Sequence, residues 1–144
     1  MSNETRHELF ESLRQMARTL TDALYAFSEG VPYIPEALDQ YEWDLGTLWN
    51  KKTGEPVDDP ETSLPYEVYD AEEYLLNLPL EVIDERGRLF TVVFATGGPH
   101  IEMTQDGAFN QPILAGYWGG EKVTLSDPIL EQAMEYYIPE MWTA

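Results

Sequence analysis

The chain has 144 residues, and its 27 Asp and Glu against 8 Lys and Arg give a net charge of −19. It contains no cysteine, which excludes disulfide bonds and thiolate metal sites. Its 43% of hydrophobic residues excludes the composition of a disordered chain. The length fits one domain with a buried core, and we expect a single acidic domain over residues 1–144.

The first predicted element is a long amphipathic helix over about residues 4–28. Apolar side chains recur at steps of three and four, which is the spacing of one helical face. These residues are Leu9, Leu13, Met16, Leu20, Leu24 and Phe27. Gly30 is a suitable stop, so this face is expected to pack against the rest of the domain.

Residues 31–69 predict less regular structure, because five prolines interrupt them. Pro35 can open a short helix through Tyr41, since proline suits the first helical turn. The sequence around residues 48–54 predicts a small hairpin or an ordered loop.

Asp70 is then placed to cap a short helix over about residues 71–77. Beyond it the pattern changes to strands. Residues 80–84 and 88–95 flank Asp-Glu-Arg-Gly, which predicts a β-hairpin. The second of these strands is apolar on both faces, as a central strand is, and its Phe90, Val92 and Phe94 are expected to be buried.

Further strands are predicted over residues 100–104, 113–118 and 122–125, with glycine-rich turns at 97–98 and 116–120. Asp127 and Pro128 suit the cap and first position of a last helix over about 128–138. Its core face would carry Leu130, Met134, Tyr137 and Met141. The sequence therefore predicts an α+β fold, in which a mainly antiparallel sheet of about four strands packs against a long N-terminal helix and a C-terminal helix.

The negative charge is concentrated in the middle of the chain. Residues 19–85 hold 17 acids and two lysines, a net charge of −15, whereas residues 1–18 are neutral overall and residues 86–144 carry −4. Direct binding of nucleic acid is disfavoured, because it requires Lys and Arg to neutralise phosphates. A partner is instead expected to be a basic protein.

Acidic and aromatic residues interleave in two stretches, 33–49 and 66–74. Carboxylates can stand in for phosphates in a basic groove, and large aromatics supply buried anchors. The candidate partner-binding residues are Glu36, Asp39, Tyr41, Glu42, Trp43, Asp44, Tyr69, Asp70, Glu72 and Glu73. The competing interpretation is an acidic surface that serves only solubility.

A second kind of site is His100 with Glu102, which lie two apart on a predicted strand and so share a face. A histidine–carboxylate pair can perform acid–base chemistry, although a polar sheet face is the commoner meaning of this spacing. The chain has no complete catalytic, phosphate-binding or metal-binding motif. We therefore expect no enzymatic activity, no cofactor and no metal, and keep a small enzyme or ligand-binding domain using His100 and Glu102 as an alternative.

In size, charge and aromatic content the chain resembles small phage or plasmid proteins that mimic DNA to block restriction or CRISPR enzymes. The stretches 96–102 and 116–120 also resemble mobile-element proteins of unassigned function. The first resemblance implies an inhibitor of a basic nucleic-acid-binding enzyme, of anti-CRISPR or antirestriction type. An immunity-type protein that neutralises a basic toxin is the alternative. The polar residues 1–8 lack a signal-peptide layout, and no apolar run reaches the ~18 residues of a membrane helix, so a cytoplasmic protein without membrane contact is expected.

Overall fold

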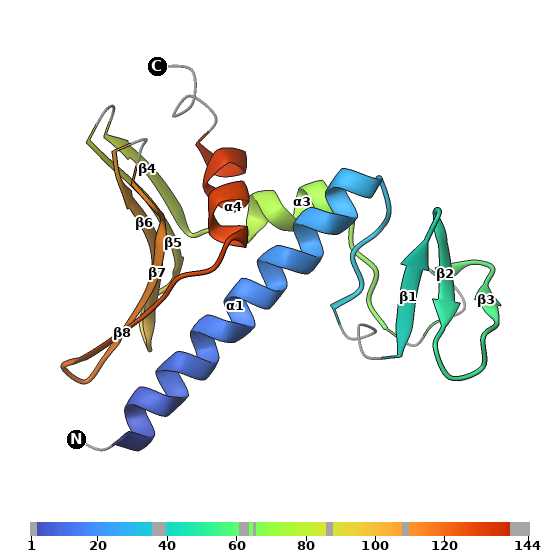
Figure 1. The fold of residues 1–144 in the computed structure, drawn as a ribbon, viewed down its shortest axis with the longest axis horizontal. Helices are drawn as coiled ribbons and strands as arrows, with labels where there is room; N and C mark the ends of the chain where they lie inside the picture. Colours follow the sequence, from blue (N-terminus) through green and yellow to red (C-terminus); the bar gives the residue numbers. More distant parts are fainter. Residues whose placement is uncertain are drawn as a thin grey trace. The chain divides into compact units, whose positions relative to one another are not determined.

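The computed structural model describes residues 3–35, 40–60, 64, 66–85, 88–107 and 110–138. It is an α+β fold with a long N-terminal helix, a C-terminal helix and antiparallel sheets, as predicted (Figure 1). The chain groups into two compact units. The first, the sheet unit, comprises Met1–Thr21 and Asn77–Ala144, and the second, the acidic unit, comprises Asp22–Leu76. Helix α1 (Asn3–Glu29) contributes residues to both.

The sheet unit contains a five-stranded antiparallel meander in which each strand pairs with the next one along the chain. All five segments that the sequence predicted as strands belong to it, so the sheet has five strands where about four were expected. The strands are β4 (Glu81–Glu85), β5 (Leu89–Ala95), β6 (His100–Asp106), β7 (Ile113–Trp118) and β8 (Glu121–Leu125).

One face of this sheet carries the core of the unit. Phe90, Val92 and Phe94 are buried, as predicted for a central strand. Val92 stands opposite Met103 on β6, and Met103 stands opposite Leu114 on β7, so the strand register places three buried side chains in one row. This row is the centre of the core, because all three side chains are fully buried.

Helix α4 (Ile129–Tyr137) closes the unit. Asp127 accepts a hydrogen bond from the backbone N–H of Ile129 at 3.0 Å, which confirms the predicted cap. Leu130 and Met134 are fully buried, as predicted, and Tyr137 is half-buried. Met141 lies outside the described residues.

Helix α1 buries Leu9, Leu13, Leu20 and Leu24, in agreement with its apolar spacing. Phe27, in contrast, is 41% exposed, so its assignment to the core was wrong. The buried positions in the last turns are Ala23, Leu24 and Ala26. Leu24 continues the face of Leu13, whereas Ala23 and Ala26 lie on another side of the helix, in the part of it that belongs to the acidic unit.

Gly116 lies inside β7, which confirms the strand predicted over residues 113–118 and not the alternative that this glycine belongs to a turn. A Cβ atom at this position would be 3.2 Å from Cδ2 of Leu13 and 3.5 Å from Cδ2 of Leu9. The missing side chain therefore lets α1 lie directly against the sheet.

The acidic unit contains a small antiparallel sheet of β1 (Tyr41–Asp44), β2 (Thr47–Asn50) and β3 (Pro56–Val57), in that order. The predicted hairpin is thus confirmed. The predicted helix is wrong at Tyr41, which begins a strand because its side chain packs on the small core described next, and residues 36–39 lie outside the described residues.

The buried centre of this small core is Ile34 and Leu48. Half-buried hydrophobic side chains surround it, namely Tyr41, Trp43, Val57, Leu64, Tyr66 and Val68. Aromatic and aliphatic side chains thus contribute equally to this half-buried shell, three of each.

The loop between β1 and β2 is unusual. Leu45 and Gly46 both have positive φ angles, 50° and 83°. Such two-residue loops match the twist of a hairpin, but they favour Asn or Gly at the first position. Leu45 is 99% exposed, so no packing compensates for its backbone conformation.

Helix α3 (Ala71–Asn77) follows Asp70, as predicted. Among the described residues, no helix combines the length and apolar character that crossing a membrane requires.

Replacing Leu20 with Ala is expected to lower the free energy of unfolding by about 2–5 kcal/mol, because the side chain is fully buried. The matched variant Phe27→Ala removes a larger side chain from the same helix and is expected to cost less, because Phe27 is exposed. Urea unfolding followed by circular dichroism measures both. A larger loss for Phe27→Ala would contradict the assignment of the buried face.

Candidate protein-binding surface

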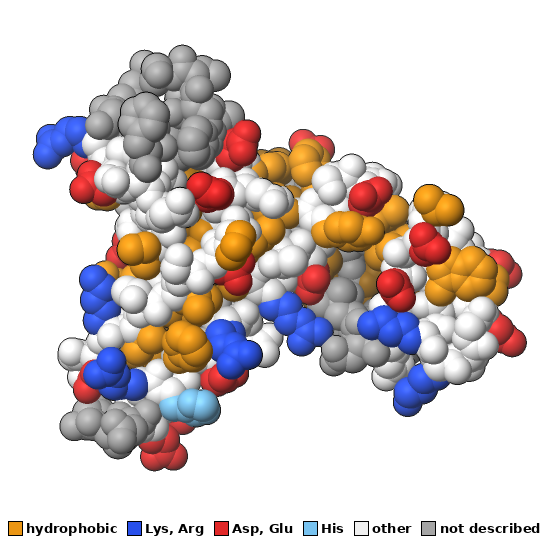
Figure 2. Space-filling view, viewed as in Figure 1, with side chains coloured by type: hydrophobic (Ala, Val, Ile, Leu, Met, Phe, Trp, Pro, Cys, Tyr) orange, Lys and Arg blue, Asp and Glu red, His pale blue; other side chains and the backbone are white. Residues whose placement is uncertain are grey.

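The acidic unit carries most of the net charge. It holds 14 Asp and Glu against Lys51 and Lys52, a net charge of −12, whereas the rest of the chain carries −7. On the face shown in Figure 2, carboxylates stand singly among neutral side chains, and Lys and Arg lie between some of them. On this face the charge is thus dispersed rather than gathered into one patch.

Strand β1 alternates aromatic and acidic residues, and the two kinds point in different directions. Tyr41 and Trp43 are half-buried and pack on the core of the acidic unit. Glu42 and Asp44 are exposed. The aromatics therefore hold the strand in place, while the two carboxylates are available to a partner.

The hairpin register adds a residue outside the predicted set. Glu42 stands directly opposite Trp49 on β2, and Trp49 is exposed. Residues paired across an antiparallel ladder have side chains on the same face. This places an exposed aromatic ring beside an exposed carboxylate, which is the combination expected of an interface.

The remaining predicted residues lie at the start of α3. Oδ1 of Asp70 accepts a hydrogen bond from the backbone N–H of Glu73 at 2.9 Å, which is the contact of a helix cap. Glu72 and Glu73 occupy the first turn and are exposed. Negative charge is stabilising there because of the helix dipole, so these acids also have a structural role.

Tyr33 links the predicted residues of β1 with those at the start of α3. Its backbone exchanges two hydrogen bonds with Tyr69, at 2.8 and 2.9 Å, and its ring packs edge-on against Tyr74 of α3. The segment before β1 is thus joined to the segment before α3. Glu36 and Asp39 lie outside the described residues, so their predicted role stays a prediction.

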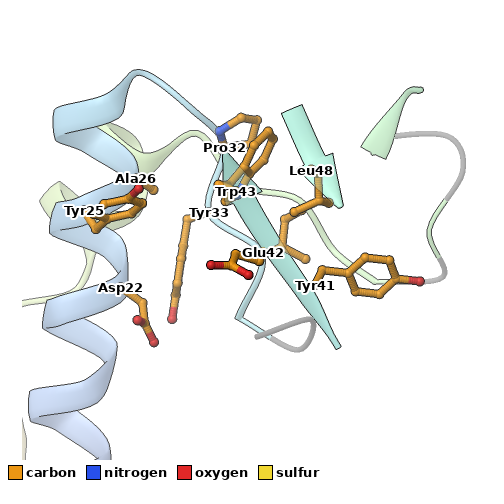
Figure 3. A pocket seen from close by; sticks show the side chains of 10 residues that line it. Asp22, Tyr25, Ala26, Pro32, Tyr33, Tyr41, Glu42, Trp43 and Leu48 are labelled. Atoms are coloured by element: carbon orange, nitrogen blue, oxygen red, sulfur yellow. The ribbon is translucent and has the colours of Figure 1, made fainter. Parts of the chain in front are cut away.

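The acidic unit also contains a pocket of about 210 Å³, here called the aromatic pocket (Figure 3). Its lining comes from the end of α1, the segment after it, and the hairpin. The residues are Asp22, Tyr25, Ala26, Pro32, Tyr33, Ile34, Tyr41, Glu42, Trp43 and Leu48.

The sequence did not reveal this pocket. Tyr25 and Ala26 follow Asp22 by three and four positions, so the sequence alone indicates that both share a helix face with Asp22. What this face meets depends on a contact with β1, which no local pattern encodes.

A second hollow of about 350 Å³ lies near the start of α3. It brings together Tyr69, Asp70 and Glu72 from the predicted set with Phe27 and Val31. Phe27, the exposed side chain of α1, thus borders a surface that contains predicted partner-binding residues.

His100 and Glu102 lie on β6 in the sheet unit, on the face opposite to the one that buries Met103. Nε2 of His100 is 3.2 Å from Oε1 of Glu102, and their side chains are 36% and 21% exposed. The ring of Tyr117 lies 5.8 Å from that of His100. Within the described residues, no group of three or more metal-ligating side chains is found.

Comparisons of the chain with protein-family models, with curated proteins and with solved structures find no match. The function is therefore argued from the geometry and charge of the chain itself.

Two variants of Asp70 separate the structural role of this carboxylate from its charge. Asp70→Ala is expected to lower the free energy of unfolding by about 0.5–2 kcal/mol, because the cap of α3 is lost. Asp70→Asn is expected to leave it nearly unchanged, because Asn caps as well as Asp. Urea unfolding measures both, and an equal loss in the two variants would show that charge, not the cap, stabilises α3.

Proposed function

We propose that the protein is a non-enzymatic acidic inhibitor that occupies the basic groove of a nucleic-acid-binding enzyme, with carboxylates in place of phosphates. The observation that carries this proposal is the net charge of −12 on the acidic unit, most of it on exposed side chains. The exposed acids are Glu29, Glu42, Asp44, Glu55, Asp58, Asp59, Glu67, Asp70, Glu72 and Glu73.

A basic groove on the partner supplies the positive charge that complements the acidic unit. Opposite charge accelerates the encounter of two proteins and suppresses wrong partners. An enzyme that binds nucleic acid carries such a groove by necessity, because it must neutralise phosphates. The proposal thus places the protein in the cytoplasm with an enzyme such as a restriction or CRISPR nuclease as its target.

Dispersed charge has a consequence for how binding is achieved. A single exposed ion pair contributes only ~0.2–1 kcal/mol, so affinity has to come from many pairs together. Salt screens such pairs, since the Debye length is about 10 Å at 0.1 M ionic strength. Inhibition should accordingly weaken as salt increases.

The test is inhibition of DNA cleavage by a panel of purified restriction and CRISPR nucleases. Reversing Glu42, Asp44, Glu72 and Glu73 to Lys together is expected to abolish inhibition of the susceptible nuclease, because four attractive contacts become repulsive. Circular dichroism checks that the variant is folded.

The matched control reverses four exposed acids of the sheet unit, Glu4, Glu8, Glu131 and Glu135. Glu4 and Glu131 lie in first helical turns, as Glu72 and Glu73 do, so the cost to helix stability is comparable. This control is expected to retain inhibition. Equal loss in both variants would mean that bulk charge alone matters and that the acidic unit is not the binding surface.

The same charges suit an immunity protein that neutralises a basic toxin. Competition separates the two functions, because an inhibitor in a nucleic-acid groove is displaced by excess DNA.

The enzymatic alternative rests on the contact between His100 and Glu102. We expect His100→Ala to leave the inhibition within about threefold of wild type, because the pair lies in the sheet unit and not in the acidic unit. The cleavage assay measures this. Selective loss of activity in a folded His100→Ala protein would favour chemistry at this pair.

A further inference from the structure

The aromatic pocket is lined by two carboxylates and four aromatic rings. The carboxylates are those of Asp22 and Glu42, and the rings are those of Tyr25, Tyr33, Tyr41 and Trp43. None of the ten described residues that line it is Lys or Arg. We propose that this pocket receives an arginine side chain of the basic partner, an inference that rests on the proposed function.

The carboxylates reach the pocket from two different elements. Asp22 lies on the last turns of α1, and Glu42 projects from β1 toward the end of that helix (Figure 3). A guanidinium group presents several N–H donors in a planar fork, so it can bind the exposed carboxylate of Glu42. The charge of this carboxylate thus favours a cation in the pocket.

The aromatic rings add a second attraction. A guanidinium cation stacks on the face of Trp or Tyr, and the contact strengthens where water is excluded. Among the lining residues Tyr33 is buried, whereas Tyr25 is 51% exposed. The lining therefore combines a buried ring with an exposed one, which suits a long side chain whose backbone stays outside.

The size of the pocket selects a single side chain. Pockets for drug-sized ligands or cofactors measure about 300–1,000 Å³. At about 210 Å³ the aromatic pocket is smaller than these. It suits one amino-acid side chain better than a nucleotide or a cofactor.

The edge position of β1 in its sheet allows the partner to present an arginine beside the pocket. The strand lies at the end of the sheet order β1-β2-β3, and no further strand pairs with it among the described residues. Three consecutive residues of β1, Tyr41, Glu42 and Trp43, line the pocket, so this edge strand forms part of its wall. An extended segment of the partner can lie beside such an edge.

The probe is N-acetyl-arginine amide, titrated into the full chain and followed by the NMR signal of the Trp43 indole, which Trp43→Phe assigns. Binding is expected for arginine amide and not for N-acetyl-citrulline amide, which has the same shape without the charge. N-acetyl-lysine amide should bind more weakly. Equal shifts with citrulline, or equal affinity for lysine, would overturn the choice of arginine.

A matched pair of variants locates the site. Glu42→Gln and Asp44→Asn each remove one exposed charge from β1, but only Glu42 lines the pocket. We expect Glu42→Gln to weaken arginine binding about tenfold and Asp44→Asn by less than about twofold. Equal effects would show that the amide senses bulk charge and would overturn the pocket proposal.

The nuclease assay distinguishes this inference from the proposed function. If wild type inhibits and Glu42→Gln inhibits no worse than Asp44→Asn, the pocket is not used and the inhibitor function stands. If arginine amide binds as described but no nuclease is inhibited, the pocket stands as a cation site and the inhibitor function fails.

Discussion

The close approach of α1 to β7 is the contact on which the sheet unit depends. Leu9 and Leu13 lie over Gly116, where any side chain would meet them at 3.2–3.6 Å. Gly116 and Leu114 lie two apart on β7, so this approach is on the face of the sheet that carries the buried row of Val92, Met103 and Leu114. Interiors are close-packed, so a contact of this kind fixes the position of the helix as well as stabilising it.

Electrostatic repulsion within the acidic unit opposes its folding. Its carboxylates repel one another, and such repulsion destabilises a compact state. In its small core, Ile34 and Leu48 form the buried centre, and half-buried side chains, three of them aromatic, surround these two among the described residues. Aromatic rings bury a large area while leaving one edge at the surface. The same rings can therefore serve stability and recognition together.

The sheet unit was largely predictable from the sequence, because its signals are local. Alternation and turn residues marked the strands, and Asp127 marked the start of α4. The acidic unit was less predictable. Tyr41 was predicted as the end of a helix that begins at Pro35. It lies in a strand instead, because its side chain packs on the small core.

The prediction that Phe27 is buried was wrong for a related reason. The helical spacing assumes one buried face along the whole helix. The end of α1 belongs to a different unit, where Ala23 and Ala26 are buried besides Leu24 and Phe27 is exposed. Of the candidate site, the acidic residues could be found from composition. The pocket could not, since Asp22 and Glu42 are brought together only by tertiary structure.

The backbone conformation of Leu45 predicts which residues would be retained at position 45 when variants of the protein are selected. Its left-handed backbone and exposed side chain are both unfavourable, and Asn would remove both disadvantages. A library of position 45 sorted only for resistance to proteolysis should therefore discard leucine quickly. The same library sorted for activity in cells would retain leucine only if the hairpin tip touches another molecule. The fate of one residue under two selections thus reports whether the loop belongs to an interface.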